Sequence, residues 1–116
     1  MGLISLEGLE FFAYHGYYDE EQKIGNKYSI DVSIEADLAH AAETDRLKDT
    51  ISYEDVYALV VKVMKHKHRL LEHVAHEIID QIKQNFPAAK QVTASVSKYN
   101  PPIGGICHRA KVTISR

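Results

Sequence analysis

Lys98 lies at the end of a predicted strand, where its amine can take part in acid and base chemistry. It continues the face of Val92, Ala94 and Val96 along a predicted strand, because side chains alternate between the two faces. The stop YNPPIGG follows at once. A partly desolvated lysine at a rigid strand end exchanges protons near neutral pH. A lysine that only extends from the strand end into water is the plain alternative.

Glu72 is a second candidate, in the first turn of a predicted helix that contains LLEHVAHEI. A carboxylate there complements the helix dipole, which is the simpler interpretation. The same carboxylate, beside backbone amides that lack helical partners, can also bind a ligand edge that offers two donors and one acceptor. Both interpretations remain open on spacing alone.

The histidines and the cysteine are weaker candidates for chemistry. His73 and His76 are three apart on a helix, and His66 and His68 lie in the basic segment KHKHR. Zinc requires three or four convergent ligands, so this spacing only suggests a metal site, and solvated histidines are the more frequent case. Cys107 has no nearby cysteine partner and is expected to be an idle or buried thiol. The cations of KVMKHKHR are better placed to complement a helix carboxyl end than to bind phosphate.

Composition limits the classes of protein that fit. With 116 residues and a net charge of −2, the chain predicts one domain, residues 1–116, without general attraction to nucleic acid or anionic membranes. Its apolar runs are too short to span a bilayer. The first residues carry Glu7 and Glu10 and no positive segment, so no signal peptide is expected. The lone cysteine fits the cytoplasm. No Walker, G-x-G-x-x-G, H-E-x-x-H or G-x-S-x-G element occurs.

Hydrophobic periodicity predicts the elements that position these side chains. The clearest strand is 27–38, where apolar and polar residues alternate with period two. Residues 3–12 alternate less regularly but also predict a strand. Ser52 and Asp55 resemble a capping box that opens a helix continuing to about Lys67. Further elements are expected as a helix from 71 to about 86 and strands at 91–99 and 107–115.

The order of these elements predicts the fold class. A β-β-α-α-β-β chain with two amphipathic helices fits an α+β protein, in which both helices cover one face of a four-stranded antiparallel sheet. The other face of the long strand is polar. Long open edges of such a sheet favour association with further subunits, so we expect an oligomer.

Four stretches together resemble the dihydroneopterin aldolase family of folate biosynthesis. They are FFAYHGYYDEEQKIG, TDRLKDTISYEDV, LLEHVAHEI and SKYNPPIGG, in order along nearly the whole chain. The resemblance implies the tunnelling fold, with a homo-octamer of two stacked rings and sites between adjacent subunits. It also implies retro-aldol cleavage of 7,8-dihydroneopterin, a pterin, to 6-hydroxymethyl-7,8-dihydropterin and glycolaldehyde. The expected reaction uses no metal, no cofactor and no Schiff base with the protein, and C2' epimerisation is a side reaction.

The resemblance also implies roles for individual residues. Lys98 would be the main acid and base, supported by Glu21, which would also contact the substrate's hydroxyl groups. Glu72 would bind the 2-amino group and N3–H of the pterin, and the Leu71 amide would contact its acceptor. From a neighbouring subunit, Tyr53 would assist proton transfer and Ile51 would line the ring pocket.

Two positions depart from the pattern that is common in this family. Ala13 stands where a glycine is common, and Ser52 where histidine is frequent. Glu20, next to Glu21, leaves a one-residue ambiguity that the distance to Gly25 resolves in favour of Glu21.

Three other functions are alternatives to the aldolase. They are a 2'-epimerase acting on dihydroneopterin or its triphosphate, a non-catalytic pterin-binding subunit, and a zinc enzyme of the same broad fold.

Overall fold

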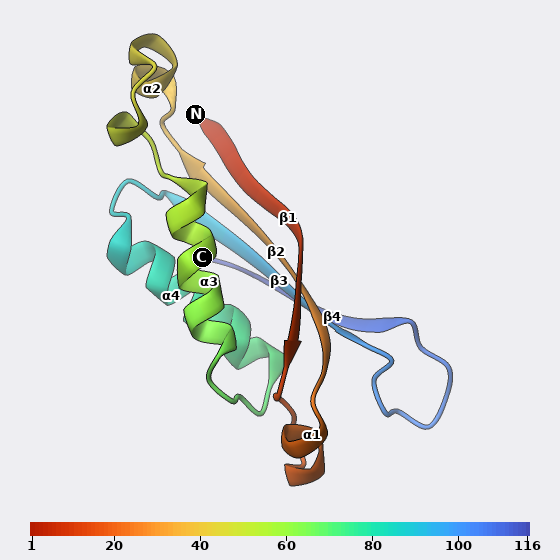
Figure 1. Cartoon of the computed structure of the whole chain (residues 1–116). Helices are drawn as coiled ribbons and strands as arrows, with labels where there is room; N and C mark the ends of the chain where they lie inside the picture. The colour runs from red at the N-terminus through yellow and green to blue at the C-terminus, as the bar shows by residue number, and fades with distance from the viewer.

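The computed structural model describes all residues, 1–116, and its four strands and two long helices follow the β-β-α-α-β-β order expected from the sequence. Four strands form one antiparallel sheet, and the two long helices lie together on one side of it (Figure 1). No helix has the length and apolar character needed to cross a membrane. The elements are β1 (Gly2–Ala13), α1 (Asp19–Ile24), β2 (Asn26–Ala36), α2 (Ala39–Thr44), a 3-10 turn (Leu47–Asp49), α3 (Tyr53–Met64), α4 (Leu71–Asn85), β3 (Gln91–Tyr99) and β4 (Arg109–Ser115).

Several local expectations were wrong. Two segments for which the sequence predicts no helix or strand contain the short helices α1 and α2, which bury no residue and so leave no apolar periodicity to detect. α3 ends at Met64 rather than near Lys67, and β4 begins at Arg109 rather than 107. Ser52 is the residue before α3, as expected, but its side chain makes no capping hydrogen bond. Its backbone carbonyl accepts from the amide of Val56 instead, at 3.1 Å.

One cluster of buried apolar side chains joins the sheet to α3 and α4. Tyr28, Ile30, Val32 and Ile34 of β2 are all at most 2% exposed, as their alternation predicts. The same face of β3 carries Val92, Ala94 and Val96, and the helices add residues such as Val60, Ile78 and Ile82. Each fully buried side chain of this size contributes about 1.5–3 kcal/mol to folding.

The imperfect alternation of β1 has a structural cause. The register with β2 shifts between Leu6 and Leu9, where Gly8 adopts φ +69° in a β-bulge. The Gly8 amide donates to Oδ1 of Asp31 at 2.7 Å. The extra residue returns Leu9 and Phe11 to the helix-covered face, so both parts of the strand contribute to the core.

The sheet face away from the helices carries hydroxyl groups that pair across the strands. Ser5 donates to Ser33 between β1 and β2 at 3.1 Å. Between β3 and β4, Ser95 pairs with Thr113 at 2.8 Å and Thr93 with Ser115 at 2.6 Å. This face is therefore polar, as the sequence predicted, and its hydroxyl pairs accompany the backbone pairing of the strands.

Candidate active site

Lys98 lies near the end of β3, on the face that packs against the core. It is paired in register with Tyr28 of β2 and Ala110 of β4, and it is only 9% exposed. Its Nζ donates to Oε2 of Glu21 at 2.6 Å. A buried amine with one carboxylate partner is held in a defined position, which is a requirement for directed proton transfer.

The short helix α1 brings Glu21 to this amine. The Gly16 amide donates to the carbonyl of His68 at 2.9 Å, and Gln22 Nε2 donates to the Gly16 carbonyl at 2.9 Å. Arg69 Nη1 donates to the carbonyl of Tyr17 at 2.6 Å. Two of these bonds tie the segment before α1 to the loop between α3 and α4, and the Gln22 bond ties α1 to that segment. Together they fix the position of α1 and therefore of Glu21.

Gly16 is necessary for this placement because no side chain fits beside Glu21. A Cβ at Gly16 would lie 2.3 Å from Oε2 and 2.4 Å from Cβ of Glu21, so the carboxylate or α1 itself would have to move. We expect Gly16→Ala to lower kcat for the pterin cleavage that the family resemblance implies by about 100-fold, since a displacement of about 1 Å in a catalytic group has such an effect. Steady-state kinetics would measure it.

Gly105→Ala is the matched control for this prediction. A Cβ at Gly105 meets no atom within 4 Å, so this variant should keep the wild-type rate. Unchanged turnover in Gly16→Ala would mean that the observed position of Glu21 does not matter for the reaction.

A polar cavity of about 260 Å³ adjoins the ion pair. Asn26 is held at its wall because Nδ2 donates to the Tyr99 carbonyl at 2.8 Å. Asn100 adopts φ +46°, which turns the chain sharply after β3. The cavity can hold a small hydroxylated group beside Lys98. Its lining residues are His15, Glu20, Glu21, Ile24, Gly25, Asn26, Lys98, Asn100 and Pro102.

Buried ionisable rings surround the amine. The hydroxyl of Tyr28 donates to the carbonyl of His15 at 2.9 Å, and burial, with the nearby Glu21 carboxylate, raises the pKa of Tyr28 to about 12. Burial, His68 and Lys98 lower the pKa of His15 to about 4. The pKa of His68 is also lowered, mainly by burial. Tyr28 and His15 are therefore neutral at pH 7.

Glu72 and Leu71 lie at the amino end of α4, as expected. Glu72 is exposed and makes no hydrogen bond or ion pair within the chain. No side chain caps this helix, and the backbone amides of Leu71 and Glu72 have no partner in the fold. A free carboxylate beside free amides presents the donor and acceptor pattern needed to bind a ligand edge.

Ile51 and Tyr53 lie at the opposite end of the sheet. Ile51 is buried next to Ala36 in a hollow beside the end of β2, and Tyr53 is 60% exposed at the start of α3. Seven residues of β3 separate that end from Lys98, or about 23 Å at the usual rise of a strand. Within one chain, therefore, the six predicted site residues do not come together.

The remaining candidates do not form a metal centre. The rings of His68 and His73 are 5.1 Å apart and those of His73 and His76 are 6.2 Å apart. No three His, Cys, Asp or Glu side chains are grouped so that they could hold a metal ion. Cys107 is unpaired, and its thiol donates to the Arg109 carbonyl.

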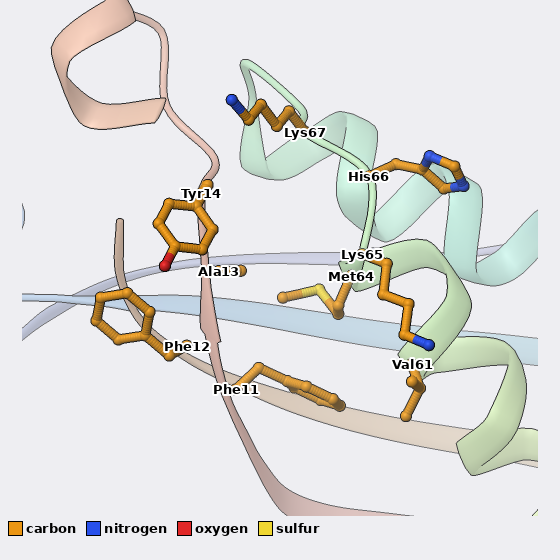
Figure 2. Close-up of a pocket in the computed structure, with 9 residues that line it drawn as sticks. All are labelled: Phe11, Phe12, Ala13, Tyr14, Val61, Met64, Lys65, His66 and Lys67. Atoms are coloured by element: carbon orange, nitrogen blue, oxygen red, sulfur yellow. The ribbon is translucent and has the colours of Figure 1, made fainter. Parts of the chain in front are cut away.

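A second hollow, of about 370 Å³, lies between the end of β1 and the end of α3 and shares no lining residue with the Lys98 cavity. Figure 2 shows aromatic side chains of β1 on one side and Met64 with the following basic residues on the other. Lys65, His66 and Lys67 thus line this hollow and not the Lys98 cavity. We refer to it below as the β1 hollow.

Sequence reasoning did not identify His15 and Gly16 as parts of the site. Both are buried in an irregular segment between β1 and α1, where no hydrophobic period marks a position as important. The only signal was their place within FFAYHGYYDEEQKIG, which by itself assigns no role to either residue.

Known proteins resemble this chain over its whole length. The family model for dihydroneopterin aldolase matches residues 4–115. A dihydroneopterin aldolase of Bacillus subtilis is 33% identical, over 100% of this chain and 98% of that protein. A dihydroneopterin aldolase of Streptococcus pyogenes serotype M18 is 36% identical, over 90% of this chain and 89% of that protein.

The solved structures agree with these sequence matches. The E. coli dihydroneopterin aldolase in complex with neopterin has a TM-score of 0.91 at 28% identity, covering 100% of this chain and 99% of that one. The likeness in sequence and the likeness in backbone structure both cover the residues that form the fold and the Lys98 cavity. The chain therefore belongs to the dihydroneopterin aldolase family.

Proposed function

We propose that this chain, acting as one domain over residues 1–116, is a cytoplasmic aldolase that cleaves 7,8-dihydroneopterin by metal-free acid and base catalysis. The observation that supports this most is the buried Lys98 amine, 2.6 Å from the Glu21 carboxylate at the wall of a polar cavity. The relatives' shared name and the neopterin bound to the E. coli protein support the choice of substrate.

Proton transfer by Lys98 accounts for the bond changes. Lys98 accepts the proton of the 2'-hydroxyl, the C1'–C2' bond breaks, and C2' leaves as the aldehyde carbon of glycolaldehyde. The electron pair of the broken bond moves into the N5=C6 imine of the ring. The proton held by Lys98 is then delivered to C1', which returns the amine to its starting state, and the imine re-forms to give 6-hydroxymethyl-7,8-dihydropterin. The substrate supplies its own electron acceptor, so no Schiff base with the lysine is required.

Glu72 and the Leu71 amide are the proposed pterin-binding groups. The ring offers two donors, the 2-amino group and N3–H, which suit the two carboxylate oxygens of Glu72. The free amide of Leu71 can donate to the acceptor on the same edge. Binding by this edge would orient the side chain of the substrate, which is the part that reacts.

A second copy of the chain is the proposed source of Tyr53 and Ile51. Both edges of the sheet, β1 and β4, have unpaired backbone groups, and Leu3 and Phe12 on β1 are 66% and 64% exposed. The β1 hollow extends this apolar edge. These features support association into rings, and we propose the octamer of two tetrameric rings that the family resemblance implies.

Mixing two inactive variants tests whether the site is shared. We expect Tyr53→Phe and Lys98→Ala each to have low activity, and their mixed oligomers to regain activity at about one quarter of the sites by random pairing. Each restored site would combine Lys98 of one chain with Tyr53 of another. Co-expression with two affinity tags would yield the mixed species for assay.

A mixture of Lys98→Ala with Glu21→Gln is the matched control. Lys98 and Glu21 contact each other within one chain, so no mixed site can contain both wild-type residues. This mixture should stay inactive. If the first mixture also stays inactive while the oligomers form, Tyr53 does not act across subunits.

A product assay under chelation tests the proposed reaction itself. Purified protein given 7,8-dihydroneopterin with excess EDTA should release glycolaldehyde and 6-hydroxymethyl-7,8-dihydropterin at the rate seen without EDTA. Loss of activity that added zinc restores would favour a zinc enzyme. Pterin binding without any turnover would favour a non-catalytic subunit.

The same assay separates the aldolase from a triphosphate epimerase. The Lys98 cavity is lined by one lysine and two glutamates, and Lys65 and Lys67 line the β1 hollow instead, so a triphosphate would find little positive charge at Lys98. We therefore expect cleavage of dihydroneopterin with C2' epimerisation as a minor product. Inversion of the triphosphate without any glycolaldehyde from dihydroneopterin would contradict the proposal.

A further inference from the structure

His15 carries a buried hydrogen-bond donor that nothing in the fold uses. The side chain is 2% exposed, and its Nε2 has no hydrogen-bond partner. It is the one buried side-chain nitrogen or oxygen in the whole chain that is left unpaired. An unpaired buried polar group destabilises the fold, so a native protein that keeps one usually has a use for it.

The surroundings of His15 fix which nitrogen bears the proton. The backbone amide of His68 donates to Nδ1 of His15 at 3.1 Å, so Nδ1 is an acceptor. The ring is neutral at pH 7, because its pKa is about 4. A neutral imidazole that accepts at Nδ1 carries its proton at Nε2. The unpaired group is therefore an N–H donor.

The same residue lines the Lys98 cavity. Eight of the nine residues around this cavity are not hydrophobic, and two carboxylates and two amides contribute to its wall. Such a wall suits a hydroxylated chain better than a flat bicyclic ring. The ring itself has a separate proposed partner, Glu72, outside the cavity lining. The part of a pterin substrate that enters the cavity beside Lys98 is thus its hydroxylated side chain. The hydrogen-bond acceptor nearest His15 is then an oxygen of that side chain.

We propose that His15 is a substrate-binding residue whose Nε2–H donates to a hydroxyl oxygen of the pterin side chain next to Lys98. This inference rests on the proposed function, since it takes the polyhydroxylated pterin as the ligand. The donor is unpaired in the free protein and paired in the complex, so binding satisfies a group that folding leaves unsatisfied. His15 thereby favours pterins with a hydroxylated side chain over pterins without one.

Two substitutions separate the two nitrogens of His15. In His15→Asn the amide oxygen can still accept from the His68 amide, but the distal donor is gone. In His15→Gln the longer side chain places an NH₂ donor near the position of Nε2. The probes are neopterin and 6-methylpterin, which share the ring and differ in the side chain. Both are titrated by fluorescence against each protein, and thermal unfolding shows that each variant is folded.

We expect His15→Asn to bind neopterin about tenfold more weakly than wild type and 6-methylpterin equally well. His15→Gln should recover most of the affinity for neopterin. Equal neopterin affinity in folded His15→Asn and wild type would overturn the inference while leaving the aldolase proposal intact. An equal loss for both ligands would also overturn it, because a purely structural role predicts that result. Wild-type protein that binds neither pterin would overturn both proposals.

Discussion

Lys98→Ala is expected to lower kcat for cleavage of 7,8-dihydroneopterin by about 10²- to 10⁴-fold, the usual contribution of a positioned acid or base. The affinity for the pterin ring should change little, because the proposed ring contacts come from Glu72 and Leu71. The large effect on kcat is expected because Lys98 is the one lysine or arginine at the wall of the cavity and its amine is held by Glu21 at 2.6 Å. Single-turnover rates and a neopterin titration would separate the two effects.

Lys90→Ala provides the matched control for Lys98. Lys90 is an exposed lysine just before β3, at the other end of the strand, so its removal should leave both kcat and binding unchanged. Oligomeric mass by light scattering should be the same for wild type and both variants. Wild-type turnover in Lys98→Ala would remove the amine from the mechanism.

Glu72→Ala should affect binding more than any other single change, with neopterin affinity falling about 100-fold. The proposed carboxylate makes two charge-assisted hydrogen bonds to the ring, and each such bond contributes about 1.5–3 kcal/mol. Because Glu72 makes no hydrogen bond or ion pair within the chain, its removal should not change the melting temperature beyond a small helix-dipole effect. Isothermal titration and thermal unfolding would measure these two quantities.

Glu54→Ala tests whether the effect is specific to the ligand. Glu54 is an exposed acidic residue in the first turn of α3, so its removal changes a helix dipole in the same way. It should bind neopterin as wild type does. If Glu72→Ala also binds normally, the carboxylate serves only the helix, and another group must hold the ring.

The sequence predicted the sheet and both long helices because their side chains repeat with clear periods. β2 alternates over its whole length, and α4 has a regular buried stripe. The position of Lys98 on the core-facing side followed from the same alternation. Periodicity works where one face of an element is buried, so it failed at α1 and α2, which bury nothing.

The site could be predicted only in part, for a related reason. Glu21 reaches Lys98 across 77 positions of sequence, through a short helix and a glycine that leaves room for it. No local pattern contains that contact, and it came from family resemblance rather than from spacing. His15 was missed because an unpaired nitrogen can be recognised only when all its possible partners are in place.

The hydroxyl pairs between β3 and β4 have a consequence for catalysis. If β3 slipped by one position against β4, Ser95 and Thr93 would lose Thr113 and Ser115 together, and apolar side chains would turn to the polar face. The same slip would rotate Lys98 to the opposite side, away from Glu21. A misaligned sheet would thus be inactive as well as less stable, so specific activity would directly report the fraction of molecules with correctly aligned strands.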